Sequence, residues 1–487
     1  MPPDDDLAVL AEVQGVLIEV LEARNSELSA RVAGLEERLA RLERLVSRNS
    51  GNSSMPPSAD DLPGRKAPGQ RKRGGSGKRP GKQPGAPGAH LAWRDDPDDT
   101  VPLFPSGPCQ CGRDLTGAAD LGISGSRQVI EVPLAAARTV QYDSHAVACA
   151  CGRVHEAPPP ADAGGAGTVT WGLNARALAV FLMVIHHVPV ERCAAILESL
   201  SGIRPSDGFV HALLARAAAA VRHANMLVRA LVITAGVVCA DETPIRVGPG
   251  PKTRKRYLLV ACTNLLTCYF LGDRTLASFE GFVFPDLSGS VAVHDRYQNY
   301  DAFAAVAHQL CCAHILRDLA DCAESHPDAV WPGQAADALR ALIHAANEAR
   351  DKGLAAVPDE VAAADLRLFR SAVLVGLQQV RRVPGAKARQ NPGRTLLECL
   401  RDREADVLRF LSDLQVPPTS NQAERDLRPA KTQQKISGRL RSEKAARDRY
   451  AVRGYASTAV KHGADALTAI RDALAGNAWM PPIPEAA

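Results

Sequence analysis

The sequence predicts a multidomain protein that is mainly α-helical, with an α/β core, an N-terminal coiled coil and a small four-cysteine β unit. Three observations support this: a leucine heptad repeat over 7–48, two cysteine pairs within 93–160, and alternating strand and helix patterns from 233 onward. At 487 residues the chain is too long for one ordinary domain. Its hydrophobic content of 46% suffices for a buried core.

The heptad repeat predicts a parallel coiled coil and hence a homodimer or a higher oligomer. Leucines recur every seven residues, at Leu21, Leu28, Leu35 and Leu42. The companion position at Asn25 is polar, which fixes register in parallel dimers. Arg31 would then pair with Glu36 of a second chain. A lone amphipathic helix on some other core is the alternative.

Residues 49–92 are rich in Ser, Gly and Pro, a composition that favours disorder. Within them, residues 62–83 hold eight Lys or Arg and no acid. This tract is either a mobile arm that neutralises DNA phosphates or a solubilising linker. We find no signal peptide and no apolar run long enough to cross a membrane, so we expect a cytoplasmic protein without a membrane partner.

Residues 93–160 predict a zinc-ribbon-like unit. Its candidate ligands are Cys109, Cys111, Cys149 and Cys151, in two C-x-C-G motifs. Four thiolates suit a structural Zn²⁺, and the glycines allow tight turns around it. The alternating residues 125–148 between the motifs read as a β-hairpin. Unliganded buried thiols are the alternative.

Residues 170–232 predict helices. Pro189 and Gly202 bound one of them, and Ser206 or Asp207 caps the next. Helices joined by short turns are compatible with a helix-turn-helix DNA-binding module, and an ordinary helical bundle fits as well.

From 233 the pattern changes to strands. An apolar run ends at Asp241, two strands follow as a hairpin, and after a helical segment another strand ends at Asp295. A last short strand runs into a helix. In an RNase H-like fold the first and fourth strands are neighbours, so Asp241 and Asp295 would meet. Paired carboxylates repel unless a divalent cation lies between them, and Mg²⁺ prefers such oxygen ligands.

Glu424 is the candidate third carboxylate. We expect it on a helix that begins at Thr419, with Gln422 completing a capping box. Asn421, Glu424 and Arg428 would share one face of that helix. An exposed ion pair between Glu424 and Arg428 is the alternative.

These residues carry a resemblance to a known family. The heptad repeat, "NSGNSSMPPSAD", "RQVIEVP", "ADETPIRV", "HDRYQNYD", "CCAHILRDL" and "NQAERDLRPAKTQQKISGRL" occur in order along nearly the whole chain. The chain resembles IS66-family transposases, which are DDE enzymes of the RNase H-like superfamily. The resemblance implies a catalytic, metal-binding triad of Asp241, Asp295 and Glu424. It also implies a catalytic domain over 233–465 with a helical insertion at about 325–410, followed by a tail over 466–487.

Three positions depart from the family pattern. Ser420 stands where an Asn is usual, Arg296 where a Gly is common, and Cys312 where an aromatic residue is frequent. None of them removes a carboxylate.

Further residues are candidates for holding DNA or supporting the site. They are Asn421, Arg425, Arg428, Lys431, Lys435, Arg439, Arg441, His314 and Arg317. A satisfied structural histidine is the alternative for His314, and a solvated charged surface is the alternative for the basic residues.

The resemblance implies DNA cleavage at the ends of an insertion sequence and transfer of the freed strand into target DNA. Mg²⁺ or Mn²⁺ would serve as cofactor. The partners would be the terminal inverted repeats, target DNA and accessory transposition proteins, in a bacterial, nucleoid-associated setting. The alternatives are a metal-dependent nuclease without strand transfer and a DNA-binding protein with an inactive core.

Overall fold

The computed structural model describes residues 4–47, 93–116, 118–130, 137–158, 169–248, 254–385 and 390–483. The predicted basic linker at 49–92 lies outside the described residues. The chain divides into two compact units, of which one comprises residues 70–137 and the other the rest. No helix within the described ranges is long and apolar enough to cross a bilayer.

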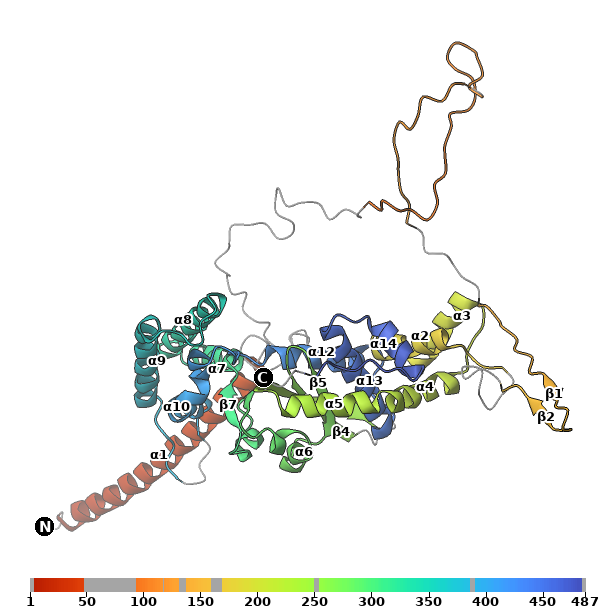
Figure 1. The fold of residues 1–487 in the computed structure, drawn as a ribbon. Coiled ribbons are helices and arrows are strands. Elements are labelled where there is room, and N and C mark those ends of the chain that lie inside the picture. The colour runs from red at the N-terminus through yellow and green to blue at the C-terminus, as the bar shows by residue number, and fades with distance from the viewer. Residues whose placement is uncertain are drawn as a thin grey trace. The chain divides into compact units, whose positions relative to one another are not determined.

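The heptad repeat lies on one continuous helix, α1 (Asp4–Ser47), drawn in red in Figure 1. Its leucine side chains are all at least 49% exposed: Leu21, Leu28, Leu35 and Leu42. An apolar stripe of this kind on a long helix is stabilised only when another surface covers it. The coiled coil therefore stays a prediction.

The two cysteine pairs adopt the same tight turn. The N–H of Cys109 donates to the Arg113 carbonyl at 2.7 Å, and the N–H of Gly112 donates to the Cys109 carbonyl at 2.8 Å. The second pair, Cys149 and Cys151, forms a turn with two equivalent bonds of the same lengths. Gly112 has φ +86°, a conformation that favours glycine. The zinc site stays a prediction, because the two pairs lie in different units.

The hairpin predicted between the cysteine pairs is wrong for the described residues of 125–145, which form no strand. Val129 and Val140 are exposed there, so their alternation reflects no buried face. A hairpin forms instead around the second cysteine turn, where β1 (Ala146–Ala148) pairs with β2 (Val154–Glu156).

A five-stranded mixed sheet with the order β5-β4-β3-β6-β7 forms the α/β core. Its strands are β3 (Val237–Val247), β4 (Arg254–Cys262), β5 (Thr267–Gly272), β6 (Val291–His294) and β7 (Ala307–Leu310). The first three strands are antiparallel, whereas β6 and β7 run parallel to β3. The predicted pairing of the first strand with the fourth is confirmed. The predicted end of the first strand at Asp241 is wrong, because pairing with β4 extends β3 to Val247.

Helices cover both faces of this sheet. On one face Val238 and Ala240 pack with α5 (Arg222–Ile233), α6 (Leu276–Glu280) and the 3₁₀ turn η3 (Phe284–Asp286). On the other face Cys239 and Val293 pack with α12 (Asn421–Ile436) and α13 (Glu443–Lys461). Because side chains alternate along a strand, residue parity decides which layer each of them meets.

Four helices separate α7 (Cys312–Ser325) from α12 in the sequence. They are α8 (Trp331–Asp351), α9 (Asp359–Gln379), α10 (Pro392–Asp402) and α11 (Glu404–Ser412). Trp331, Phe369 and Phe410 are buried in a core that these helices share with α7 and Leu310 of β7. Figure 1 shows α8, α9 and α10 gathered beside α7. The insertion predicted at about 325–410 falls on this segment.

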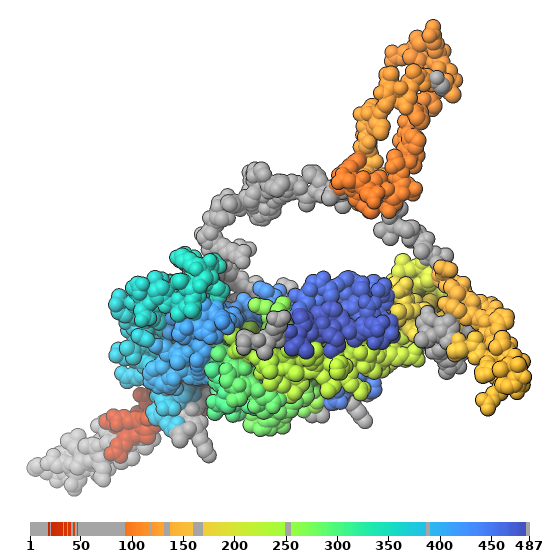
Figure 2. All heavy atoms as spheres, in the orientation of Figure 1, coloured from red at the N-terminus to blue at the C-terminus, as the bar shows by residue number. Residues whose placement is uncertain are grey.

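The helices before the sheet pack as a bundle with the C-terminal helices. The bundle comprises α2 (Leu173–Val184), α3 (Val190–Ser201), α4 (Asp207–Ala220), α13 and α14 (Ala466–Leu474), which share one core. Figure 2 shows the blue C-terminal residues lying against the yellow-green ones. Pro189 and Gly202 bound α3 as predicted, and the Ser206 hydroxyl caps α4 by accepting from the Phe209 N–H at 3.2 Å.

One buried ion pair joins α12 to α13. The Lys461 ammonium donates to Asp426 Oδ2 at 2.7 Å, and the two side chains are only 12% and 6% exposed. Thr267 of β5 and Gln422 donate to the same carboxylate at 2.9 and 3.0 Å. Lys461 also donates to the Thr263 and Leu266 carbonyls. These bonds tie α12 to the sheet edge and to α13.

We predict that Lys461→Met lowers the free energy of unfolding by about 3–5 kcal/mol, because it leaves the Asp426 charge buried and unpaired. Denaturant unfolding followed by circular dichroism measures this. The control is Lys444→Met on the same helix, whose ion pair with Asp448 is 75% exposed on the lysine side and should cost at most about 1 kcal/mol. Equal losses in the two variants would contradict the prediction.

Candidate active site

Asp241 lies on β3, and Asp295 directly follows the neighbouring parallel strand β6. β3 and β6 are in register at Cys239 and Val293, and continuing that register by two residues brings Asp241 beside Asp295. Both aspartates have the parity of Cys239 and Val293, which face α12. The sheet therefore presents two carboxylates toward one helix.

The electrostatics of Asp241 reflect this crowding. Burial, followed by the charges of Glu242 and Asp295, raises its pKa to about 8. Nearby His314 acts in the opposite direction. Burial therefore disfavours the charged form of Asp241 most strongly, and the two neighbouring carboxylates add to this effect.

Glu424 lies on α12, which packs against β3 and β4. Its Oε1 accepts from the Arg317 guanidinium at 3.1 Å and lies 4.0 Å from His314 Nε2. The Glu424 side chain remains 23% exposed. The charge of Asp295 raises the pKa of His314, and the charge of His314 lowers that of Asp241.

Two expectations for this helix are wrong. The helix begins at Asn421 with Ser420 as N-cap, instead of Thr419, and the Ser420 side chain makes no capping bond. Gln422 forms no capping box because its amide is bound to Asp426. The alternative ion pair with Arg428 is also not formed, and in the described residues Glu424 pairs with Arg317 instead.

Behind His314 lies a buried thiol, Cys311, which is 1% exposed and accepts the Ser420 N–H at 3.3 Å. Burial opposes charge on both groups, but their contact and mutual attraction outweigh it. The pKa of His314 is therefore raised to about 9 and that of Cys311 lowered to about 7. A cationic imidazole beside Glu424 suits contact with an anion.

The three departures from the family pattern are accommodated inside the fold. Arg296 is ion-paired with Asp318 of α7, so it does not project into the space between the aspartates and Glu424. Cys312 is fully buried in the helical core. Ser420 is 1% exposed and contacts Cys311.

The basic residues that follow Glu424 lie on the surface. The exposed set comprises Arg425, Arg428, Lys431, Lys435, Arg439 and Arg441, together with Asn421. In the described part of the chain, none of these six cations forms an ion pair. Unpaired surface cations next to a carboxylate cluster are suited to a polyanion that reaches into the site.

Sequence reasoning missed one acidic residue of this region, Glu242. Its carboxylate is only 2% exposed, and burial together with the charge of Asp295 raises its pKa to about 7. It follows Asp241 directly, so it faces the opposite side of the sheet. Its burial depends on Tyr300 and Arg274, which are distant in sequence and gave no local signal.

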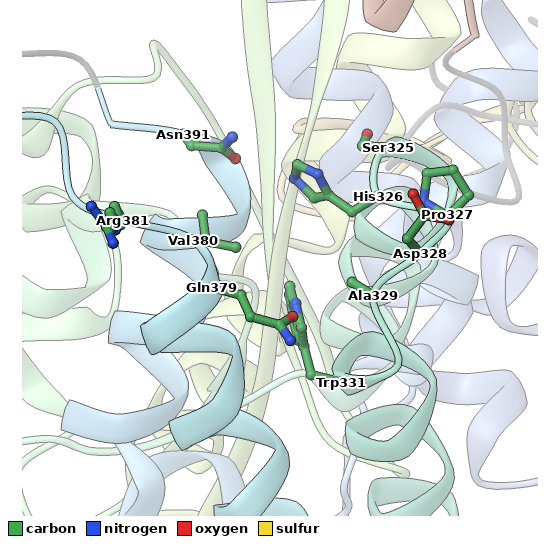
Figure 3. Close-up of a pocket in the computed structure, with 10 residues that line it drawn as sticks. All are labelled: Ser325, His326, Pro327, Asp328, Ala329, Trp331, Gln379, Val380, Arg381 and Asn391. Carbon is green, nitrogen blue, oxygen red and sulfur yellow. The ribbon is translucent and has the colours of Figure 1, made fainter.

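Among the described residues, no three His, Cys, Asp or Glu side chains lie close enough together to hold a metal ion as they stand. A cavity of about 620 Å³ lies elsewhere, between the start of α8 and the end of α9. Figure 3 shows His326 and Trp331 on one wall and Gln379 and Asn391 on the other. It contains none of the predicted site carboxylates.

The raised pKa of Asp241 predicts a pH dependence of stability in metal-free buffer. A carboxyl whose folded-state pKa exceeds its unfolded value contributes stability at low pH and loses it as the pH rises through about 8. The melting temperature of the wild type should therefore fall between pH 5 and 8. Asp241→Asn should flatten this decline, and an unchanged slope in a series of thermal melts would contradict the assignment.

The model of the transposase IS66 family matches residues 168–448, more than half of the chain. A second model, a family of unknown function (DUF6444), matches residues 2–92. No curated protein matches the chain. The chain belongs to the IS66 family of transposases.

Proposed function

We propose that this transposase transfers phosphoryl groups of DNA at a DDE site made of Asp241, Asp295 and Glu424. The observation that supports it most strongly is the parallel register of β3 with β6, which sets two aspartates level and facing α12. Glu424 approaches from that helix and adjoins His314, whose charge also acts on both aspartates. Such a core is RNase H-like in its strand order.

The chemistry of the donor set suits Mg²⁺ or Mn²⁺, because it consists of carboxylate oxygens, and the three side chains would draw closer together to hold the ion. Asp241, Asp295 and Glu424 would hold the cation. When bound, it would activate water or a 3′-hydroxyl and stabilise charge on the scissile phosphate. No covalent enzyme intermediate is required.

The chain's own residues would bind and orient the DNA. His314 and Arg317 provide positive charge beside Glu424, so they would contact the phosphate that reaches the carboxylates. The unpaired cations of α12 and of the loop after it would hold neighbouring phosphates by displacing counterions. The bundle of α2–α4 is a further candidate for gripping the element ends.

We further propose that α1 dimerises through its leucine stripe. The support is the exposed apolar heptad with its single Asn25. Leu28→Asp together with Leu35→Asp should convert a dimer into a monomer in light scattering, and a dimer that persists would exclude this helix as the interface. The two matched cysteine turns support a structural Zn²⁺, which metal analysis of the purified protein would detect or exclude.

A metal-dependent nuclease without strand transfer would use the same carboxylates and is the second candidate. The transposase and the nuclease differ in the DNA product that they form. A precut element end, Mg²⁺ and a plasmid target should yield joined DNA if the protein is a transposase with full chemistry. Cleavage without joined product would favour the nuclease.

We predict that Asp241→Asn and Glu424→Gln each reduce cleavage and joining by roughly a thousandfold or more, because each removes several kcal/mol of metal-centred charge stabilisation. Binding of element ends should persist in both variants. The control is Glu404→Gln at the start of α11, which breaks an ion pair with Arg370 of α9 and should stay near wild-type activity. If Asp241→Asn and Glu424→Gln are as active as Glu404→Gln, these carboxylates take no part in the reaction. A wild type that binds ends without metal-dependent chemistry would indicate an inactive core.

A further inference from the structure

Glu242 is a buried carboxylate for which the proposed chemistry has no use. It lies on the sheet face opposite Asp241, and its Oε1 accepts from Arg274 Nε at 2.8 Å. Its Oε2 accepts from the Tyr300 hydroxyl at 2.9 Å. Burying an acid next to Asp241 and Asp295 is costly, and these two bonds offset part of that cost.

Arg274 extends these contacts to the segment that carries Asp295. Its guanidinium lies over the Tyr297 ring, 3.8 Å from the centroid. The Tyr297 hydroxyl donates to the Arg274 carbonyl at 2.9 Å. The Tyr297 N–H donates to Asp295 Oδ1 at 2.8 Å. One continuous set of contacts therefore runs from Glu242 to a carboxylate oxygen of Asp295.

Tyr300 fixes the other end of the same segment. It is 1% exposed, and its ring stacks on His294 with centroids 4.2 Å apart. Phe279 and Phe284 meet it edge-on at 5.0 and 5.3 Å. A ring so enclosed cannot turn its hydroxyl away from Glu242 without repacking this core.

These contacts oppose the electrostatic repulsion between neighbouring carboxylates. Asp295 follows the last residue of β6, where strand pairing ends, and its charge acts on the like charges of Asp241 and Glu242. Repulsion would push this unpaired segment away from the sheet. The segment is anchored on one side by Tyr297 and on the other by Tyr300, and both anchors lead back to Glu242.

We propose that Glu242, Arg274 and Tyr300 form a positioning network that holds Asp295 at its place in the cation site. The network contacts neither DNA nor cation and acts through Tyr297 and the backbone of 295–300. The inference rests on the proposed function, because it assigns to Asp295 the role of a cation ligand.

Arg274→Gln distinguishes a positioning role from a purely electrostatic one, because the two roles predict opposite changes in cation affinity. Removing a positive charge near Asp295 should tighten cation binding if only charge matters. Loss of the contact with Tyr297 should weaken it, by about tenfold if the effect resembles that of other groups that orient metal ligands. Calorimetric titration of the full chain with Mn²⁺ alone measures the affinity. Binding as tight as in the wild type, or tighter, would overturn the proposal.

Tyr300→Phe removes one hydroxyl and keeps the ring and the net charge. The matched control is Tyr455→Phe in the helical bundle, because Tyr455 is also 1% exposed. The Tyr455 hydroxyl donates to the Ala469 carbonyl at 3.2 Å and accepts the Trp479 N–H at 2.8 Å. Both variants should lower the melting temperature, but only Tyr300→Phe should weaken Mn²⁺ binding. Equal Mn²⁺ affinities in the two variants would mean that Tyr300 only contributes to packing, and they would contradict its proposed positioning role.

Hydrogen exchange of the 295–303 peptide gives a readout that needs no metal. Arg274→Gln and Tyr300→Phe should both accelerate exchange there, whereas Tyr455→Phe should not. Unchanged exchange would overturn the positioning network. If Asp295→Ala leaves Mn²⁺ binding of the protein unchanged, the proposed cation site fails, and the exchange data still decide whether the network orders this segment.

Discussion

The arrangement of the core depends on the ion pair between Asp426 and Lys461. Two of the carboxylates of the proposed site come from the sheet region, whereas Glu424 belongs to a helix that follows four intervening helices. The pair fixes α12 against α13 and β5 at Asp426, two residues beyond Glu424. Apolar contacts of α12 could tolerate a small rotation, whereas a buried charge with several fixed partners could not. These bonds therefore restrict how far α12, and Glu424 on it, can move relative to the sheet edge.

On both faces of the sheet, the carboxylates of this region lie close to positively charged side chains. Toward α12, Asp241 and Asp295 repel one another, and His314 and Arg317 offset this in part. Toward α6, Glu242 adds a further negative charge that Arg274 balances. The protein therefore keeps several carboxylates close together, and the positively charged side chains around them offset part of their repulsion. Such an arrangement is typical of sites that bind a metal ion and a phosphate together.

Much of this could be predicted from local sequence. The apolar runs before Asp241 and Asp295 indicated strands, their order indicated neighbours, and the residues around Glu424 indicated a helix. The failures have a common cause. The strand through Asp241 continues because β4 pairs with it, and the alternation in 125–145 forms no hairpin because no core lies beneath it. The Arg317 partner of Glu424 and the burial of Glu242 depend on contacts between segments far apart in sequence, for which spacing carries no signal.

The helical segment between α7 and α12 also affects when the site can form. Asp295 leaves the ribosome long before Glu424, and the ion pair that orients α12 requires Lys461, which is later still. At typical rates of synthesis this delay is roughly ten to thirty seconds. During that time the aspartates of a nascent chain lack the proposed third carboxylate, Glu424. Under the proposed mechanism, a growing chain therefore lacks the complete site until synthesis is nearly finished.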